Sequence, residues 1–157
     1  MNNIKQKITG CILSGEFLET RSLLNELSQK DLEDLLFVMG CDEGSITIYA
    51  FVCFLIRENE TVQCHLLASK LLNIAFCHLE GAYQSSLYHT LRAIELCQDD
   101  IALKEALLFF NIIPEKIISD EKAKKIAQEI LQIKPDSAPA LDMLVNRLKQ
   151  CDGKSNK

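Results

Sequence analysis

The chain has 157 residues, of which 48% are hydrophobic, so it is long enough to form one ordinary domain with a buried core. Its 22 acidic and 17 basic residues give a formal net charge of −5. A chain of that charge is repelled by the phosphate backbone, which argues against direct binding to nucleic acid. We expect a single domain over residues 1–150 and a disordered tail over residues 151–157.

Membrane insertion and export are both disfavoured by the pattern of apolar residues. The amino-terminal segment from Asn2 to Lys7 is polar and charged, where a secretory signal would be apolar. The longest apolar run, Ile46 to Ile56, falls well short of the roughly 20 residues that cross a bilayer. The seven cysteines are an odd number and favour free thiols in a reducing compartment. We therefore expect a cytoplasmic protein without membrane contact, and expect Cys53, Cys64, Cys77 and Cys97 to pack in the core.

Glycine and serine residues divide the first part of the chain into helices. Gly15 and Gly40 are suited to helix ends, and Ser28 is suited to cap a helix start. The segment from Ser45 to Glu58 contains many residues with high strand propensity, but a single strand would leave its backbone groups unpaired. We predict helices over residues 3–14, 16–27, 28–40 and 45–58.

Capping residues and prolines divide the rest of the chain in the same way. Thr61, Ser119 and Ser137 can cap helix starts, and the acidic residues Asp99 and Asp100 favour another. Gly81, Pro114 and Pro135 mark breaks. The predicted helices cover residues 61–80, 83–97, 99–113, 119–134 and 137–150. The sequence thus predicts an all-α protein of about nine helices.

A shift of 34 residues, which is the tetratricopeptide period, superposes similar residues in the second half of the chain. The matched pairs are Ala93 with Ala127, Glu95 with Glu129, Ala106 with Ala140, and Leu107 with Leu141. The stretch from Ala127 to Ser137 also resembles the junction between two tetratricopeptide repeats. The first half of the chain lacks this pattern. We therefore expect an irregular α-solenoid with tetratricopeptide-like helix hairpins in the C-terminal half.

Three segments of the chain carry a second resemblance. The stretches Leu87 to Leu96, Lys104 to Leu108 and Pro114 to Asp120 are similar to those of small all-helical immunity proteins of bacterial polymorphic toxin and contact-dependent inhibition systems. The resemblance implies a cytoplasmic protein that binds and neutralises one cognate toxin domain, commonly a nuclease.

Two identical dipeptides, Cys64-His65 and Cys77-His78, suggest a zinc site at first sight. They are 13 residues apart on one predicted helix, which places them about 140° apart around its axis. One metal ion cannot be bound by both dipeptides in that arrangement. We therefore predict a structural role and no metal site.

No catalytic site is predicted. His89, Arg92 and Glu95 lie three residues apart and form either a polar site or an exposed ladder of ion pairs, of which the ladder is the commoner arrangement. The sequence contains no glycine loop for phosphate and no nucleophile with a base at helical spacing. We expect no enzymatic activity and no cofactor.

Charge is unevenly distributed along the chain. Residues 15–60 contain ten acidic and three basic residues, a net charge of −7, so the remainder sums to about +2. Such a run is either solvated surface or a binding face for a basic partner such as a nuclease toxin. The alternative function is a tetratricopeptide-like adaptor that binds a peptide or protein, and the oligomeric state stays open. The residues expected to bind the basic toxin domain are Glu16, Glu19, Asp31, Glu33, Asp34, Asp42 and Glu43.

Overall fold

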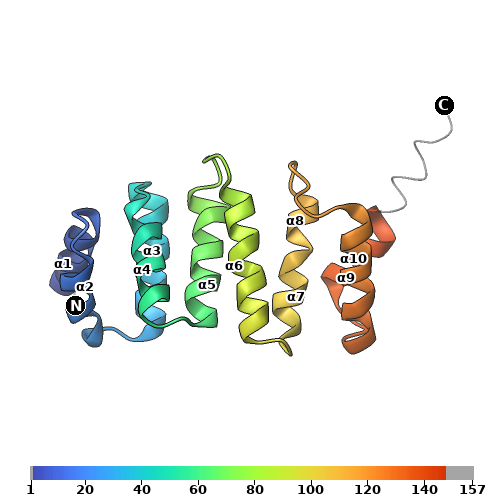
Figure 1. The fold of residues 1–157 in the computed structure, drawn as a ribbon, viewed down its shortest axis with the longest axis horizontal. Coiled ribbons are helices and arrows are strands. Elements are labelled where there is room, and N and C mark those ends of the chain that lie inside the picture. Colours follow the sequence, from blue (N-terminus) through green and yellow to red (C-terminus); the bar gives the residue numbers. More distant parts are fainter. Residues whose placement is uncertain (1, 148–157) are drawn as a thin grey trace. The chain divides into compact units, whose positions relative to one another are not determined.

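The structure is a computed structural model that describes residues 2–147, and these residues form helices with no strand among them (Figure 1). The predicted all-α class is confirmed. The ambiguous segment around Ile46 to Ile56 lies in a helix, as predicted. No helix within the described part is both long and apolar enough to span a membrane. The chain divides into two compact units, residues 1–89 and 90–157, and the predicted tail lies outside the described residues.

The first unit contains helices that follow one another in chain order, with short turns between them (Figure 1). Helix α4 packs against α1, α3 and α5, and α1 packs against α2. The elements are α1 (Asn2–Leu13), α2 (Phe17–Leu23), the 3₁₀ turn η1 (Leu24–Glu26), α3 (Gln29–Glu43), α4 (Thr47–Glu58), α5 (Val62–Lys70), the π-helical turn η2 (Leu71–Ala75) and the first half of α6 (Ala82–Leu96).

The core of the first unit lies between α1, α3, α4 and α5. Phe51 of α4 is fully buried, and its ring lies 5.3 Å from that of Phe17 and 6.0 Å from that of Phe54. Full burial of such a side chain contributes about 1.5–3 kcal/mol. Other fully buried core residues are Ile8, Ile12, Leu36, Ile48, Val52, Leu71 and Phe76.

Gly40 does not end α3, and that prediction is wrong. The helix continues to Glu43 and ends before Gly44, which adopts φ +60. Gly40 is buried inside the helix, where α3 packs against η2. A Cβ atom at Gly40 would lie 2.4 Å from Leu71 Cδ2 and 3.5 Å from Ala75 Cβ. The glycine is therefore required for the close approach of two elements.

The second unit contains the rest of α6 and the helices that follow it. Helix α9 packs against α7 and α10. The elements are α7 (Ile101–Leu107), α8 (Phe109–Ile112), α9 (Asp120–Ile133), α10 (Ala138–Asp142) and the π-helical turn η3 (Met143–Arg147). When α7 is counted with α8, and each short turn with its helix, residues 2–147 form nine helical segments, as predicted.

Predicted caps are found where they were expected. The hydroxyl oxygens of Ser28, Thr61, Ser119 and Ser137 each accept a hydrogen bond from the backbone N–H three residues later. Asp100 accepts from the backbone N–H of Ala102. Each cap satisfies a backbone donor that has no partner within its helix.

The 34-residue repeat is only partly reflected in burial. Ala93 and Ala127 are both fully buried, but Ala106 is exposed whereas its counterpart Ala140 is buried. Leu107 is buried, whereas its counterpart Leu141 is 41% exposed. Helix α7, which carries Ala106, and helix α10, which carries Ala140, therefore turn different matched positions toward the core. A solenoid along the whole chain stays a prediction.

The expectation that four cysteines pack in the core is wrong for two of them. Cys77 and Cys97 are exposed.

Replacement of Gly40 by alanine tests the close approach of α3 and η2. Leu71 is fully buried and has little room to move, so we expect G40A to lower the free energy of unfolding by about 1–3 kcal/mol. The matched control is G10A in α1, where nothing lies within 4 Å of the added Cβ. That variant gains about 0.5–1 kcal/mol from helix propensity. Urea unfolding measures the stability of both variants. If G40A lowers the free energy of unfolding by the same amount in an L71A background, the contact between Gly40 and Leu71 is contradicted.

Candidate functional site

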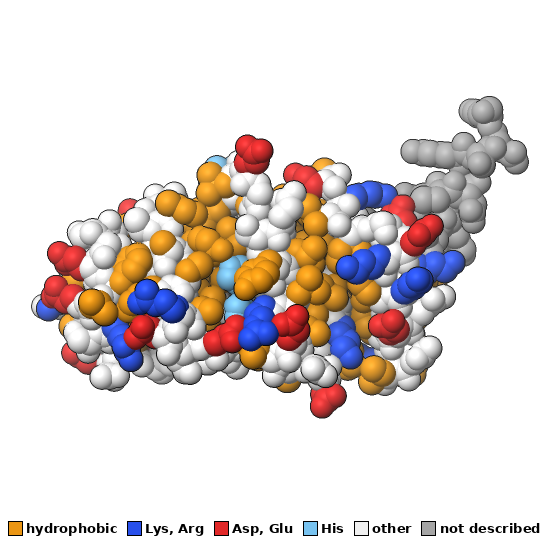
Figure 2. All heavy atoms as spheres, in the orientation of Figure 1, with side chains coloured by type: hydrophobic (Ala, Val, Ile, Leu, Met, Phe, Trp, Pro, Cys, Tyr) orange, Lys and Arg blue, Asp and Glu red, His pale blue; other side chains and the backbone are white. Residues whose placement is uncertain are grey.

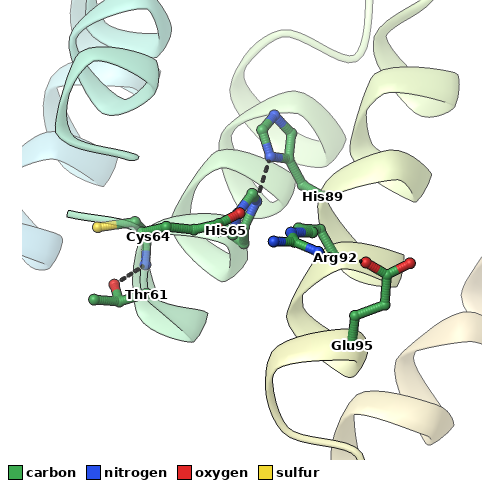
Figure 3. Close-up of polar contacts among 7 residues, drawn as sticks. Thr61, Cys64, His65, His89, Arg92 and Glu95 are labelled. Carbon is green, nitrogen blue, oxygen red and sulfur yellow. Dashed lines mark hydrogen bonds and ion pairs between the residues drawn. The ribbon is translucent and has the colours of Figure 1, made fainter. Parts of the chain in front are cut away.

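Four polar side chains of the first unit form a continuous hydrogen-bonded chain, which we call the histidine chain. The Tyr49 Oη lies 2.9 Å from His89 Nε2, and His89 Nδ1 lies 2.9 Å from His65 Nδ1. His65 Nε2 lies 3.0 Å from Glu60 Oε1. The chain thus links a phenol to a carboxylate through two imidazole rings, and Figure 3 shows the contact between the rings.

Three helices position these side chains. Tyr49 lies on α4, His65 lies in the first turn of α5, and His89 lies on α6. The exposed fractions of His65 and His89 are 1% and 4%. One turn away, Ser69 Oγ and Ser86 Oγ lie 2.8 Å apart and are also buried. The contact between α5 and α6 is therefore polar at its centre, and its buried groups are satisfied by one another.

Hydrogen-bond pairing assigns the proton positions when both histidines are neutral. The Glu60 carboxylate can only accept, so His65 Nε2 carries the proton and donates it. His65 Nδ1 is then an acceptor, and His89 Nδ1 must donate to it. His89 Nε2 is left as an acceptor for the Tyr49 hydroxyl. Every bond in the chain therefore points from Tyr49 toward Glu60.

Burial shifts the ionisation of the groups around the chain. Removal from water, with a smaller contribution from His65, lowers the pKa of His89 to about 4. Burial likewise raises the pKa of Tyr49, and it raises the pKa of the Cys53 thiol. His89 and Tyr49 are therefore uncharged at neutral pH, which agrees with the proton positions assigned above.

A cavity of about 520 Å³ lies beside the histidine chain. Histidine side chains are visible from the face drawn in Figure 2, with hydrophobic side chains beside them and charged side chains directly below them. The volume is within the range of small-molecule sites. The cavity is lined by Tyr49, Cys53, Ile56, Glu60, His65, Gln84, Ser85, Tyr88 and His89, and we call it the histidine cavity.

The predicted group of His89, Arg92 and Glu95 is divided between two arrangements. Arg92 donates to Glu95 across 2.7 Å, which is the exposed ion pair favoured from the sequence. His89 is buried instead and bonds to Tyr49 and His65. Figure 3 shows the His89 ring turned toward His65, and Arg92 with Glu95 along the helix.

The two Cys-His dipeptides are not brought together. His65 is buried in the histidine chain, whereas Cys77 and His78 are exposed. Within residues 2–147, the one group of three possible metal ligands is Cys11 with Glu16 and Glu19. Burial, followed by the charges of Glu19 and Glu16, raises the pKa of the Cys11 thiol. A protonated thiol is a poor metal ligand.

The seven acidic residues expected to bind a partner fall into three groups. Glu16 and Glu19 lie at the start of α2, with Glu19 3.7 Å from Lys7. A second group, Asp31, Glu33 and Asp34, lies near the start of α3, and the third, Asp42 and Glu43, lies at its end. All seven are exposed except Glu33, which is half-buried and accepts a hydrogen bond from Gln29.

Helix geometry aligns three of these carboxylates with an apolar side chain. At about 100° per residue, Asp31, Asp34, Val38 and Asp42 lie within about 80° of one another around α3. All four are exposed, Val38 by 53%. We call these residues the α3 stripe.

Three comparisons with known proteins gave no match: no protein-family model, no curated protein and no solved structure resembles the chain. The function must therefore be inferred from the side chains themselves.

The assigned proton positions predict distinct tautomers for the two buried histidines. We expect His65 to carry its proton on Nε2 and His89 on Nδ1 at neutral pH. Nitrogen NMR of the imidazole rings distinguishes the two forms, and exposed His78 is the internal reference. The same tautomer at both buried rings would contradict the direction of the chain.

The lowered pKa of His89 makes stability depend on pH. Between about pH 6.5 and 4 the unfolded chain binds a proton at this residue and the folded chain does not, so stability falls as the pH falls. The shift corresponds to a loss of about 3 kcal/mol at most. H89Q should flatten this dependence in urea unfolding, and H78Q, which replaces an exposed histidine, is the matched control. Equal slopes for H89Q and the parent would contradict the assignment.

Proposed function

We propose that the protein binds a basic protein partner through the α3 stripe and its neighbouring carboxylates. The more specific proposal is that it is an immunity protein, and that the partner is a cognate toxin domain with nuclease activity. The observation that carries the proposal is the stripe itself. Asp31, Asp34 and Asp42 surround the exposed apolar side chain of Val38 on one face of one helix.

The composition of the stripe suits a protein interface. An isolated exposed valine is ordinary, but here it lies between Asp34 and Asp42 on a regular helix. Binding sites commonly have an apolar centre and a polar rim. The carboxylates therefore supply orientation and association rate, and Val38 supplies apolar contact.

Charge complementarity indicates which partner fits the stripe. Residues 15–60 carry a net charge of −7, and a nuclease has a cationic groove for its substrate. Asp31 and Asp42 are eleven residues apart, about 16 Å along the helix. That separation exceeds the Debye length of about 8 Å at physiological ionic strength, so the two ends of the stripe act on different charges of the partner.

Glu16 and Glu19 extend the acidic surface beyond α3. Both are exposed near the start of α2, and Glu19 has a loose ion pair with Lys7. An exposed pair of this kind contributes about 0.2–1 kcal/mol at most, so it can open to meet a stronger basic contact.

The alternative is a tetratricopeptide-like adaptor. Such a protein would present lysine and asparagine side chains to its ligand, and α9 carries exposed Lys122, Lys124 and Lys125. Asn111 in the same unit is not available, because its amide donates to the Ile118 carbonyl and to Asp120. The adaptor proposal is therefore supported by these three lysines, all on α9. Partner binding that depends on those lysines and not on α3 would favour it.

Charge reversal in the stripe tests the proposal. We expect D31K/D34K/D42K to slow association with the proposed basic toxin domain by tenfold or more, because the attraction becomes repulsion. The matched control is E115K/E121K/E129K, which changes the charge equally at exposed positions of the second unit. Surface plasmon resonance at several salt concentrations measures both, and neutralisation of the toxin is assayed in parallel.

Two outcomes would contradict the proposal. One is equal binding and equal salt dependence in the stripe and control variants, since the stripe would then be solvated surface. The other is binding that leaves the partner's activity intact, which would exclude an immunity role while retaining an acidic interface. Circular dichroism and urea unfolding confirm folding, because exposed substitutions change stability by about 0.5 kcal/mol or less.

A further inference from the structure

The histidine cavity presents hydrogen-bond acceptors at both ends of the histidine chain. Tyr49 donates its one proton to His89, and its oxygen, which also has a hydrogen bond with the Cys53 side chain, lies at the cavity wall where it can accept. At the other end Glu60 is a carboxylate whose side chain is 35% exposed. Because all bonds point from Tyr49 toward Glu60, each polarises the next and makes the phenol oxygen a better acceptor.

The remaining walls of the cavity are aromatic and apolar. Tyr88 is 62% exposed, and its ring lies edge-on to the His89 ring at 5.2 Å. The Tyr49 ring lies 5.7 Å from the same imidazole, and Ile56 and Cys53 complete the lining on α4. An aromatic face attracts a cation within about 6 Å of its centre. Neither lysine nor arginine is among the described residues that line the cavity.

We propose that the histidine cavity binds a cationic hydrogen-bond donor on an apolar stem, that is, a guanidinium or alkylammonium group. The cation donates to Tyr49 Oη, lies near the Glu60 carboxylate and packs its stem against Ile56 and the ring of Tyr88. This inference does not rest on the α3 stripe, and it concerns a different set of residues.

Two other ligand classes fit the cavity poorly. An anion would meet the acceptor oxygens of Tyr49 and Glu60. A zinc ion between the histidines is disfavoured because their Nδ1 atoms lie 2.9 Å apart, whereas two nitrogens on one tetrahedral zinc stand about 3.3 Å apart. The two nitrogens share a proton instead, which is the contact that holds α5 to α6.

Titration with arginine amide tests the site, and citrulline amide is the matched neutral probe of nearly equal shape. NMR of the folded protein should show the Tyr49, Tyr88, His65 and His89 signals shifting with arginine amide. Citrulline amide should bind at least about tenfold more weakly, the loss expected when a hydrogen bond loses its charge. Equal binding of the two probes, or no shift up to the solubility limit, would overturn the proposal.

Two variants locate the binding. Y49F removes the acceptor and should weaken arginine amide about tenfold or more. Y88L alters only an exposed wall and should weaken it about threefold, so it remains informative if Y49F is poorly folded. Y83F is the control, since Tyr83 is not among the lining residues. Equal losses in Y83F and Y88L, or signal shifts confined to the carboxylates of α3, would show unspecific attraction and overturn the site.

The source of the cation is decided by competition. If saturating arginine amide displaces the basic partner, the cavity takes a lysine or arginine side chain of that partner. If the partner stays bound, the cavity takes a free amine or guanidine. Both outcomes keep the cation site, and failure of the α3 variants to affect partner binding would leave it unaffected.

Discussion

The packing of α5 against α6 depends on satisfying polar groups that are almost fully removed from water. His65 and His89 meet at the centre of this contact, and Ser69 and Ser86 meet one turn away. A buried polar group without a partner costs about 1–3 kcal/mol, so only a narrow range of helix positions is tolerated. An apolar contact would allow small shifts of one helix along the other, because it has no hydrogen bonds to keep in register. The paired histidines instead fix the distance between α5 and α6, and with it the position of Tyr49 and the shape of the histidine cavity.

Local chemistry explains why the helices could be predicted from the sequence. A cap such as Ser28, Ser119 or Ser137 bonds to a backbone N–H only three residues away, so its effect does not depend on the rest of the fold. Gly40 shows the limit of this reasoning. A glycine that ends a helix and one that admits a neighbouring helix look alike in sequence, and the distinction depends on Leu71, 31 residues later.

The candidate site was only partly visible in the sequence for the same reason. His65 and His89 were both noted, but each was grouped with neighbours on its own helix, whereas its partner lies 24 residues away on the facing helix. Tyr49 lay in a segment of high strand propensity and gave no sign of a role. Charge counting found the acidic stretch, but the helix period was needed to place Val38 among Asp31, Asp34 and Asp42. Composition therefore indicates the sign of the charge on a surface, and helix geometry indicates which side chains lie together on it.

The histidine chain also shows how a negative potential can reach a cavity without a buried charge. A carboxylate placed where His89 lies would lose its hydration and be driven to its neutral form. Glu60 avoids that cost because its side chain remains 35% exposed to water. The two imidazoles carry its influence inward through aligned hydrogen bonds, each donor being polarised by the acceptor beyond it. The phenol oxygen of Tyr49 therefore gains acceptor strength although the imidazole of His89, to which it donates, is uncharged at neutral pH.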